Sequence, residues 1–206
     1  MKTLFIETIK KLELNEEKFN ELEKLLPNTV YIAYSIQYKK LAEQSKEKLK
    51  KTFKILGFSQ ILGCSELKTS AKAILLLGEA RFHALNLALS SGKEVYIFDN
   101  HSISKITLEE IEKLRKQEKG KYLKYLTSSK IGILVSFKSG QENLELALKL
   151  KKEIETKGKT PYFFLADNIN APELENFPIE LWINTACSGI SSDSGRILNY
   201  KQITNK

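Results

Sequence analysis

The sequence predicts an α/β fold made of two consecutive domains, each with a small, mainly parallel sheet flanked by helices. Apolar stretches of strand length alternate with amphipathic stretches of helix length along the 206 residues. That alternation is typical of strand–helix–strand units built on a parallel sheet. The segment 73–78 is continuously apolar rather than alternating, as expected of a strand that is buried on both faces.

In the N-terminal half of the chain, short apolar stretches predict strands. Segments with apolar residues three and four positions apart predict helices. Pro27 cannot continue a helix, and a glycine commonly follows a helix C-terminus, which is the role expected of Gly57 and Gly92. In chain order the elements are a strand at 4–6, a helix at 16–26, a strand at 30–34, a helix at 36–53, a strand at 73–78, a helix at 82–90 and a strand at 95–99.

A long charged helix at 108–127 divides the chain. Thr107 is a suitable N-cap, and Glu109 and Glu110 fall in the first turn, where the helix dipole favours anions. The sequence therefore predicts two Rossmann-like domains, residues 1–106 and residues 107–206.

The second domain repeats the same alternation of elements. Gly140 and Gln141 open its first predicted helix, which Gly158 ends. In order the elements are a strand at 131–136, a helix at 140–156, a strand at 162–165, a short helix that begins at Leu174 and a strand at 181–184.

The composition restricts the class of partner. The formal net charge is +8, but arginine occurs only at Arg81, Arg115 and Arg196. Arginine is the residue that reads bases and phosphates with two bonds, so direct nucleic-acid reading is not expected. The lysines are typical of a solvated surface, and the alternative is an electrostatic surface for an acidic or RNA-bearing partner. The sequence shows neither an apolar run of membrane-spanning length nor a signal peptide, which predicts a cytoplasmic protein without a membrane partner.

Two cysteines are the residues most able to carry chemistry. Cys64 lies between Gly63 and Ser65, and Cys187 follows an apolar stretch. In a cytoplasmic chain, free or metal-bound thiols are expected rather than a disulfide. Closely spaced Cys/His pairs of the zinc type are absent. A shared metal site, a Cys–His nucleophile pair and plain buried thiols remain open.

Two loops follow predicted buried strands. The loop 136–141 leads into a helix and would offer N–H groups to a carboxylate or phosphate, or is an ordinary tight turn. The loop 78–83 (Gly-Glu-Ala-Arg-Phe-His) puts Glu79, Arg81 and His83 at a strand end, where open α/β sheets bind ligands. Alternatively, it is a helix N-terminal turn whose histidine is satisfied locally. No nucleotide-binding glycine fingerprint and no hydrolase elbow is present.

Several segments, in their order, resemble one family. They are Tyr31–Tyr38, Leu62-Gly63-Cys64, Gly78 with Arg81-Phe82-His83, Gly132–Val135 with Gly140-Gln141, and Asn184-Thr185-Ala186-Cys187. Together they resemble the diphthamide synthases, the 2-(3-amino-3-carboxypropyl)histidine synthases of archaea and eukaryotes. The resemblance covers nearly the whole chain.

This resemblance implies a transferase with radical chemistry. Family members have three similar α/β domains that each contribute one cysteine to a [4Fe–4S] cluster, and the fourth iron binds S-adenosyl-L-methionine. A 3-amino-3-carboxypropyl radical then adds to a histidine of translation elongation factor 2, and the family usually works as a dimer. The resemblance implies Cys64 and Cys187 as metal ligands. It implies a contact with S-adenosyl-L-methionine for Gly140 and Gln141, and a cofactor-binding role for Arg81 and His83.

The departures from the family define the hypotheses. The chain begins where the family's second domain begins, so we expect a separate first-domain polypeptide or second subunit to supply the third cysteine, and this chain alone to be inactive. Glu79-Ala80 stands for Asp-Gly of the family, and Ser188-Gly189 for Pro-Arg. These replacements favour an alternative, a cluster-free accessory or binding module of the same pathway. A truncated gene and an unrelated Rossmann-like small-molecule protein are the remaining readings.

Overall fold

The structure is a computed structural model that describes residue 4 and residues 6–63, 65–192 and 194–204. Contacts divide the chain into two compact units, Met1–Glu112 and Lys113–Lys206. The predicted domain boundary between residues 106 and 107 stays a prediction.

Unit 1 contains a five-stranded sheet in the order β2-β1-β3-β4-β5. The strands are β1 (Thr29–Tyr34), β2 (Lys54–Gln60), β3 (Ala73–Leu77), β4 (Glu94–Phe98) and β5 (Ile103–Lys105). All neighbours pair in parallel except β4 and β5, which are antiparallel. The central strand β3 is buried at every position, which explains its continuously apolar sequence.

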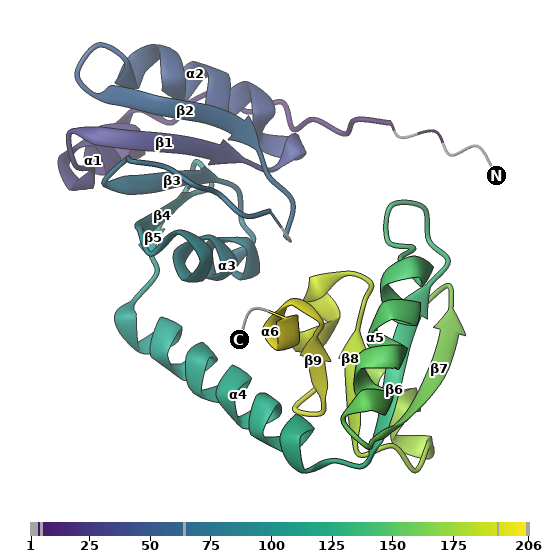
Figure 1. Cartoon of the computed structure of the whole chain (residues 1–206). Coiled ribbons are helices and arrows are strands. Elements are labelled where there is room, and N and C mark those ends of the chain that lie inside the picture. The colour runs from purple at the N-terminus through teal and green to yellow at the C-terminus, as the bar shows by residue number, and fades with distance from the viewer. Residues whose placement is uncertain (1–3, 5, 64, 193, 205–206) are drawn as a thin grey trace. The chain divides into compact units, whose positions relative to one another are not determined.

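Helices cover both faces of this sheet, and successive residues of a strand face opposite cores. Figure 1 shows α2 (Lys39–Leu49) on one side of the sheet and α3 (Arg81–Ser91) on the other. Ile32 of β1 belongs to the core with α1 (Glu16–Leu25) and α2. Its neighbour Ala33 belongs to the core with α3.

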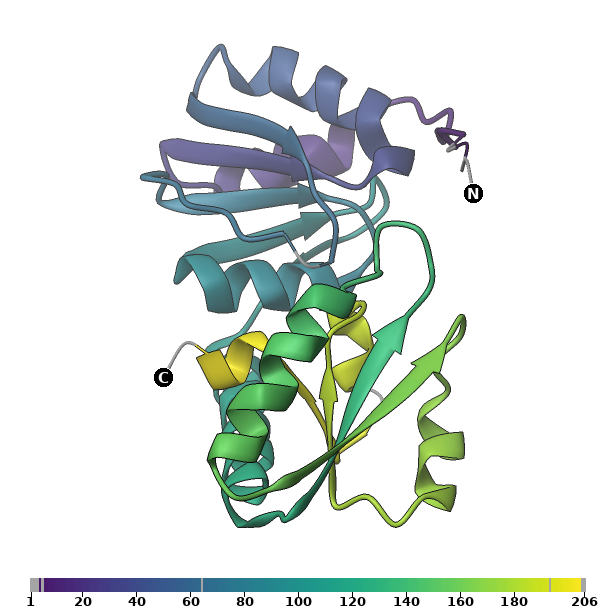
Figure 2. The same cartoon turned by 45° about the vertical axis from the view of Figure 1, so that its right-hand side comes forward.

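Unit 2 contains a four-stranded, fully parallel sheet in the order β7-β6-β8-β9. The strands are β6 (Lys130–Ser136), β7 (Thr160–Ala166), β8 (Leu181–Asn184) and β9 (Ile197–Asn199). Figure 2 shows β6 and β7 side by side with α5 (Leu144–Thr156) alongside them. Every β8 residue is buried.

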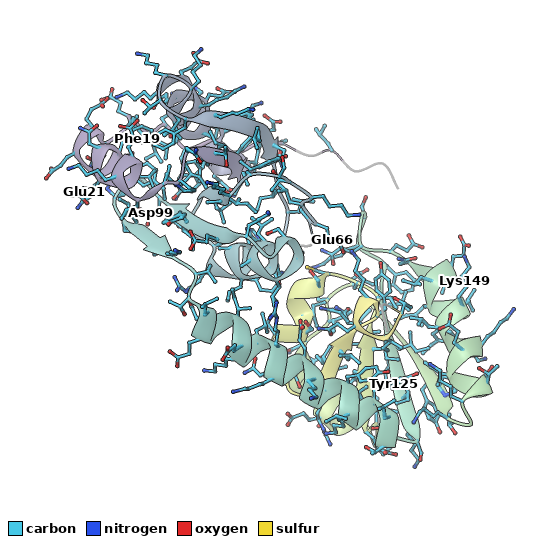
Figure 3. The ribbon with its side chains drawn as sticks, turned by 60° about the vertical axis from the view of Figure 1, so that its left-hand side comes forward. Phe19, Glu21, Glu66, Asp99, Tyr125 and Lys149 are labelled. Atoms are coloured by element: carbon cyan, nitrogen blue, oxygen red, sulfur yellow. The ribbon has the colours of Figure 1, made fainter. Side chains whose placement is uncertain are left out.

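The two faces of the second sheet are covered differently. One core contains residues of α5, of α4 (Leu108–Thr127) and of the short α6 (Lys201–Thr204). The buried Tyr125 of α4 belongs to this core, whereas Lys149 of α5 projects into solvent (Figure 3). The other face packs on residues of the 3-10 helix η2 (Ala171–Asn176).

Gly132 and Trp182 pack closely together in unit 2. The two residues are paired across β6 and β8, and a Cβ atom on Gly132 would lie 2.2 Å from Cε3 of the indole. Phe164 of β7 meets the same indole edge-on, with ring centroids 4.5 Å apart. The indole therefore fills the space that a larger residue at position 132 would occupy.

The structure confirms the mixed α/β fold with two mainly parallel sheets and most of the predicted elements. The helix 108–127 has the predicted bounds. Its capping box is formed because Thr107 Oγ1 accepts from the Glu110 N–H at 3.2 Å and the Glu110 carboxylate accepts from the Thr107 N–H at 2.8 Å. Gly92 follows the end of α3 as predicted, and the structure shows it as a C-cap in the left-handed conformation. None of the helices in the described ranges is both long and apolar enough to cross a membrane.

Several predicted elements of unit 1 are wrong. Leu4 and Ile6 are not in a strand and are exposed, and Phe5 lies outside the described residues. The predicted helix 36–53 is instead the 3-10 helix η1 (Ile36–Tyr38) followed by α2, which ends at Leu49. Gly57 is not a helix cap, because it lies inside β2 beneath the ring of Tyr31.

The remaining corrections concern unit 2. Helix α5 begins at Leu144, so Gly140 and Gln141 lie in the preceding turn rather than in the helix. The segment around Leu174 is the 3-10 helix η2, which already begins at Ala171. Strand β9 was not predicted, and neither were β2 and β5 in unit 1.

Candidate functional site

Each sheet changes its winding direction beside its first strand. Strand β1 lies between β2 and β3, and β6 lies between β7 and β8. Such a switch point leaves room beyond the carboxyl ends of the strands, which is where open α/β sheets bind ligands. The candidate residues predicted from sequence follow these strand ends in both units.

Cys187 lies just beyond the carboxyl end of β8, and it is an exposed, free cysteine. The side chain of Cys187 is exposed, but hydrogen bonds hold its backbone in place. The Cys187 carbonyl accepts from the Ile190 N–H at 3.1 Å and from Nδ2 of Asn184 at 2.7 Å. Thr185 ties the same loop to β6, because its N–H and its hydroxyl both donate to the Leu134 carbonyl. The thiol is thus presented at the edge of the sheet from an ordered loop.

Gly140 and Gln141 follow β6, so they share the carboxyl edge of this sheet with Cys187. Gly140 has φ +78°, a left-handed conformation that glycine adopts readily. The Gln141 N–H donates to the Lys138 carbonyl at 2.9 Å and is therefore not free for a ligand. A carboxylate bound here would need other donors of the turn, and the assignment of Gly140 and Gln141 stays a prediction.

Cys64 lies outside the described residues, but its neighbour Gly63 is described. A Cβ atom on Gly63 would lie 2.9 Å from Cε1 of Phe82 and 3.0 Å from Cδ2 of His83. Asn86 of α3 donates to the Gly63 carbonyl at 2.8 Å. The structure therefore brings two segments of the resemblance together, the Leu62-Gly63 segment and the Arg81-Phe82-His83 segment.

His83 is half-buried beside this loop. Burial lowers the pKa of its imidazole, which favours the neutral ring at neutral pH. Its Nδ1 atom is buried and has no hydrogen-bond partner among the residues that the structure describes. The alternative reading, a histidine satisfied by local hydrogen bonds, is thus not what the structure shows for Nδ1.

Arg81 is engaged elsewhere. Its guanidinium donates from Nε to Oε1 of Glu110 at 2.6 Å and from Nη2 to Oε2 at 2.8 Å. The guanidinium lowers the pKa of Glu110 to about 2, and the carboxylate raises the pKa of Arg81. Arg81 therefore ties the start of α3 to the first turn of α4, and its predicted ligand contact remains untested.

Sequence reasoning missed a polar cluster at the switch point of the first sheet. The side chain of Glu79 accepts hydrogen bonds from Lys10 and Tyr38, and Lys10 Nζ lies 3.1 Å from the Tyr38 hydroxyl. The bonds to Glu79 and Tyr38 raise the pKa of Lys10 to about 12, and those from Lys10 and Tyr38 lower the pKa of Glu79. No local pattern around Lys10 signals this contact, because 69 residues separate Lys10 from Glu79.

The segment that carries Lys10 crosses the strand ends of unit 1. Asn100, which follows β4, accepts from the Asn15 N–H and donates to the Glu13 carbonyl, each at 2.9 Å. At the other end the Lys10 N–H donates to the Gln37 carbonyl beyond β1. We call residues 10–15 the crossing segment. It occupies part of the edge where ligands bind in related architectures.

The cysteines of this chain could serve as ligands of an iron–sulfur cluster. Cysteine thiolates hold the iron atoms of such clusters, and the exposed Cys187 between Ala186 and Ser188 suits one such ligand. Within the described ranges, no group of three or more His, Cys, Asp or Glu side chains could hold a metal ion. The sequence contains two cysteines, so a site with three thiolates needs a ligand from outside these 206 residues.

Comparison with known proteins points to one family. Residues 1–202 match the family model described as "Putative diphthamide synthesis protein". The chain is 32% identical over 205 residues to 2-(3-amino-3-carboxypropyl)histidine synthase of Methanocaldococcus jannaschii, a match that covers 94% of this chain and 57% of the relative. The enzyme of the same name from Pyrococcus horikoshii is 29% identical over 136 residues, which is 65% of this chain and 40% of that relative. The chain spans about half the length of these two relatives.

Solved structures agree on the fold. Dph2 from Pyrococcus horikoshii superposes with a TM-score of 0.84 at 24% identity, over 96% of this chain and 63% of that one. A structure of Dph2 from the same organism with a 4Fe-4S cluster gives a TM-score of 0.81 at 25% identity, over 92% and 60% of the two chains. The first of these likenesses supports the fold alone.

Proposed function

The chain belongs to the diphthamide synthesis protein family, and on that premise we propose that it supplies the second and third domains of a diphthamide synthase. The proposed reaction transfers a 3-amino-3-carboxypropyl group from S-adenosyl-L-methionine to a histidine of translation elongation factor 2 in the cytoplasm. The curated relatives named as 2-(3-amino-3-carboxypropyl)histidine synthases support a transferase.

The observation that carries the proposal is the exposed thiol of Cys187 on an ordered loop at the switch point of a parallel sheet. In the proposal Cys187 and Cys64 each bind one iron of a [4Fe–4S] cluster. The Dph2 structure with a 4Fe-4S cluster supports an iron–sulfur cofactor. When bound and reduced by an external electron donor, the cluster would supply the electron that breaks the carbon–sulfur bond of S-adenosyl-L-methionine. The protein contributes ligands, an open approach and a fixed geometry.

Other residues of the chain have proposed supporting roles. Gly63 lies close to the rings of Phe82 and His83, and its carbonyl accepts a hydrogen bond from Asn86. In the proposal these contacts hold the backbone that precedes Cys64 in the sequence. Gly140 and Gln141 lie at the same sheet edge as Cys187, so their turn is the proposed contact for the carboxylate of S-adenosyl-L-methionine. Arg81 contributes in the proposal by fixing the start of α3 through Glu110.

The proposed synthase needs a third thiolate from a first-domain polypeptide or a second subunit, because this sequence has two cysteines. We therefore expect no transfer by this chain alone. A partner that supplies one cysteine would complete the cluster site and form the active assembly with elongation factor 2 as substrate.

The test is co-expression with a polypeptide carrying the family's first domain, followed by anaerobic reconstitution with iron and sulfide. We expect an iron–thiolate absorbance band and, after a chemical reductant such as dithionite is added, transfer of label from S-adenosyl-L-methionine to elongation factor 2. Cys187→Ala abolishes both signals, whereas Ser129→Ala, a similar change beyond the opposite edge of the second sheet, leaves both unchanged. Absence of a cluster in the intact pair would refute the proposal.

The alternative function is a cluster-free accessory module of the same pathway. Glu79 favours it, because this side chain binds Lys10 and Tyr38 and the crossing segment lies over the edge of the first sheet. The two functions differ in their need for thiols. If Cys64→Ala and Cys187→Ala leave diphthamide formation unchanged in a complementation assay, the accessory role is the correct one.

A further inference from the structure

Two asparagines at the ends of neighbouring strands, Asn184 and Asn199, form hydrogen bonds to the loop that carries Cys187. Asn184 ends β8 and Asn199 ends β9, and the two residues are paired across the parallel strands. Asn184 is buried, with 1% of its surface exposed. A buried amide group needs hydrogen-bond partners within the protein, because water does not reach it.

The Asn184 amide is bonded at each of its donor and acceptor groups. Its Oδ1 accepts from the Ala186 N–H at 3.0 Å. Its Nδ2 donates to the Cys187 carbonyl at 2.7 Å and to Oδ1 of Asn199 at 2.8 Å. One side chain therefore holds the backbone immediately before Cys187 and the carbonyl of Cys187 itself.

The Asn199 amide extends these contacts to the other side of the loop. Its Nδ2 donates to the Ser188 carbonyl at 3.2 Å and to the Ser191 hydroxyl at 2.8 Å. The Ser191 hydroxyl in turn donates to the Ser188 carbonyl at 2.9 Å. Both hydrogens of each amide are used, which fixes the orientation of the two side chains.

The backbone around Cys187 needs such contacts. Ser188 and Gly189 follow the cysteine, and neither residue restricts its own backbone as a proline would. The segment 188–192 is the short 3-10 helix η3 (Ser188–Ser192), a kind of element with weak internal hydrogen bonds. The order of the loop therefore depends on side chains that reach it from the sheet and on Lys121 of α4, whose Nζ donates to the Ser191 carbonyl.

We propose that Asn184 and Asn199 are positioning residues that form a two-amide clamp on the Cys187 loop and hold the thiol in one place for metal binding. The metal-binding part rests on the proposed function. The clamp itself is tested without a metal, so failure of the clamp and failure of the proposed function are distinguishable. Replacement of either amide by a carboxylate keeps the shape but removes the donors that face the carbonyl oxygens.

The test uses a nitroxide spin label on Cys187 of the full chain carrying Cys64→Ser, so that one thiol reacts. The electron paramagnetic resonance line shape then reports local motion at Cys187. We expect a restricted spectrum for the parent and a several-fold larger mobile fraction in Asn184→Asp. Asn170→Asp, which changes an exposed asparagine of the same unit, leaves the spectrum as in the parent. Circular dichroism checks that secondary structure is retained.

A second variant covers the case in which Asn184→Asp does not fold. Asn199→Asp removes the donors to Ser188 and Ser191 but keeps an acceptor for Asn184, so we expect a smaller rise in the mobile fraction. An unchanged line shape in a folded Asn184→Asp variant, or in Asn199→Asp, overturns the clamp. In the reconstituted pair, a heterogeneous cluster spectrum in Asn184→Asp supports the metal-positioning role, and a parent-like spectrum refutes it.

Discussion

The guanidinium of Arg81 donates hydrogen bonds to both carboxylate oxygens of Glu110, with donor–acceptor distances of 2.6 and 2.8 Å. Such two-bond pairs are the strongest kind of charge-assisted hydrogen bond. Because Glu110 also accepts from the Thr107 N–H, this one carboxylate caps α4 and anchors α3. The pair therefore joins α3 to α4 through two residues that are 29 positions apart in the sequence.

The Glu110 carboxylate predicts an acid-sensitive contribution to stability. Its pKa falls from 4.5 to about 2 in the folded state, so its contribution is complete above pH 4.5 and is lost as the pH falls towards 2. Glu110→Gln should lower the free energy of unfolding by about 1 kcal/mol at neutral pH, since both side chains are partly exposed. Urea unfolding followed by circular dichroism at pH 7 and pH 3 measures this difference.

The matched control for this prediction is Glu109→Gln, an exposed neighbour in the same helical turn. We expect it to change stability by less than about 0.5 kcal/mol. A difference between Glu110→Gln and the parent that stays constant from pH 7 to pH 3 would contradict the role assigned to the pair.

Gly63 predicts a steric coupling beside Cys64. In Gly63→Ala the new methyl group would lie 2.9 Å from Phe82 and 3.0 Å from His83, so the loop or the rings must move. We expect a loss of about 1–3 kcal/mol in stability, the usual range for overpacking. In a Gly63→Ala/His83→Ala double variant the loss should be smaller than the sum of the two single losses, which a double-mutant cycle of urea unfolding measures.

Gly120 provides the control for a glycine without such contacts. It lies inside α4, and nothing stands within 4 Å of the position of its added Cβ. Gly120→Ala should stabilise its helix by up to about 1 kcal/mol. Additive losses in the Gly63 and His83 double variant would show that the two positions do not touch.

The Lys10–Glu79 pair predicts protection of the crossing segment from protease. Glu79→Gln removes the charge that holds Lys10, so trypsin should cut after Lys10 or Lys11 several-fold faster than in the parent. The raised pKa of Lys10, about 12, means that the ion pair persists up to at least pH 10.5. Mass spectrometry of timed digests measures the rate.

The control for proteolysis is Glu94→Gln, which removes another exposed ion pair of unit 1, the one with Lys105. It should leave cleavage in the crossing segment unchanged. Equal cleavage rates in Glu79→Gln and the parent would show that the backbone contacts of the segment suffice to protect it.

Two substitutions of Asn100 should separate the free-energy cost of backbone strain from the cost of lost hydrogen bonds. It has φ +82° and is buried, and it holds both Glu13 and Asn15. Asn100→Gly should cost about 1–3 kcal/mol through its lost hydrogen bonds. Asn100→Ala should cost about 1 kcal/mol more, because alanine also resists positive φ. Equal losses in the two variants, measured by urea unfolding, would contradict this division.

The predictable part of the fold follows from local signals. The apolar run Ala73–Leu77 identifies β3, and Thr107 with Glu110 marks the start of α4, because burial on both faces and capping leave traces in adjacent residues. The strand β2 was missed since its half-buried residues and Gly57 give no clear alternation. The three-residue β9 is too short for a periodic signal.

The candidate site was only partly accessible from sequence. The position of Cys187 just past a buried strand was predicted from its preceding apolar stretch, whereas the exposure of its side chain was not. The contact of Gly63 with His83 was not predicted either, because it depends on how the loop after β2 folds onto α3. The loop 136–141 was expected to offer free N–H groups, but the N–H of Gln141 is not one of them, because it donates to the Lys138 carbonyl.

The packing of Trp182 against Gly132 has a practical consequence for measurement. The sequence contains one tryptophan, and its indole is buried in unit 2, with 1% of its surface exposed. Intrinsic tryptophan fluorescence therefore reports the unfolding of unit 2 alone, while unit 1 contributes only tyrosine emission. A fluorescence transition that differs from the circular-dichroism transition would show directly that the two units unfold independently.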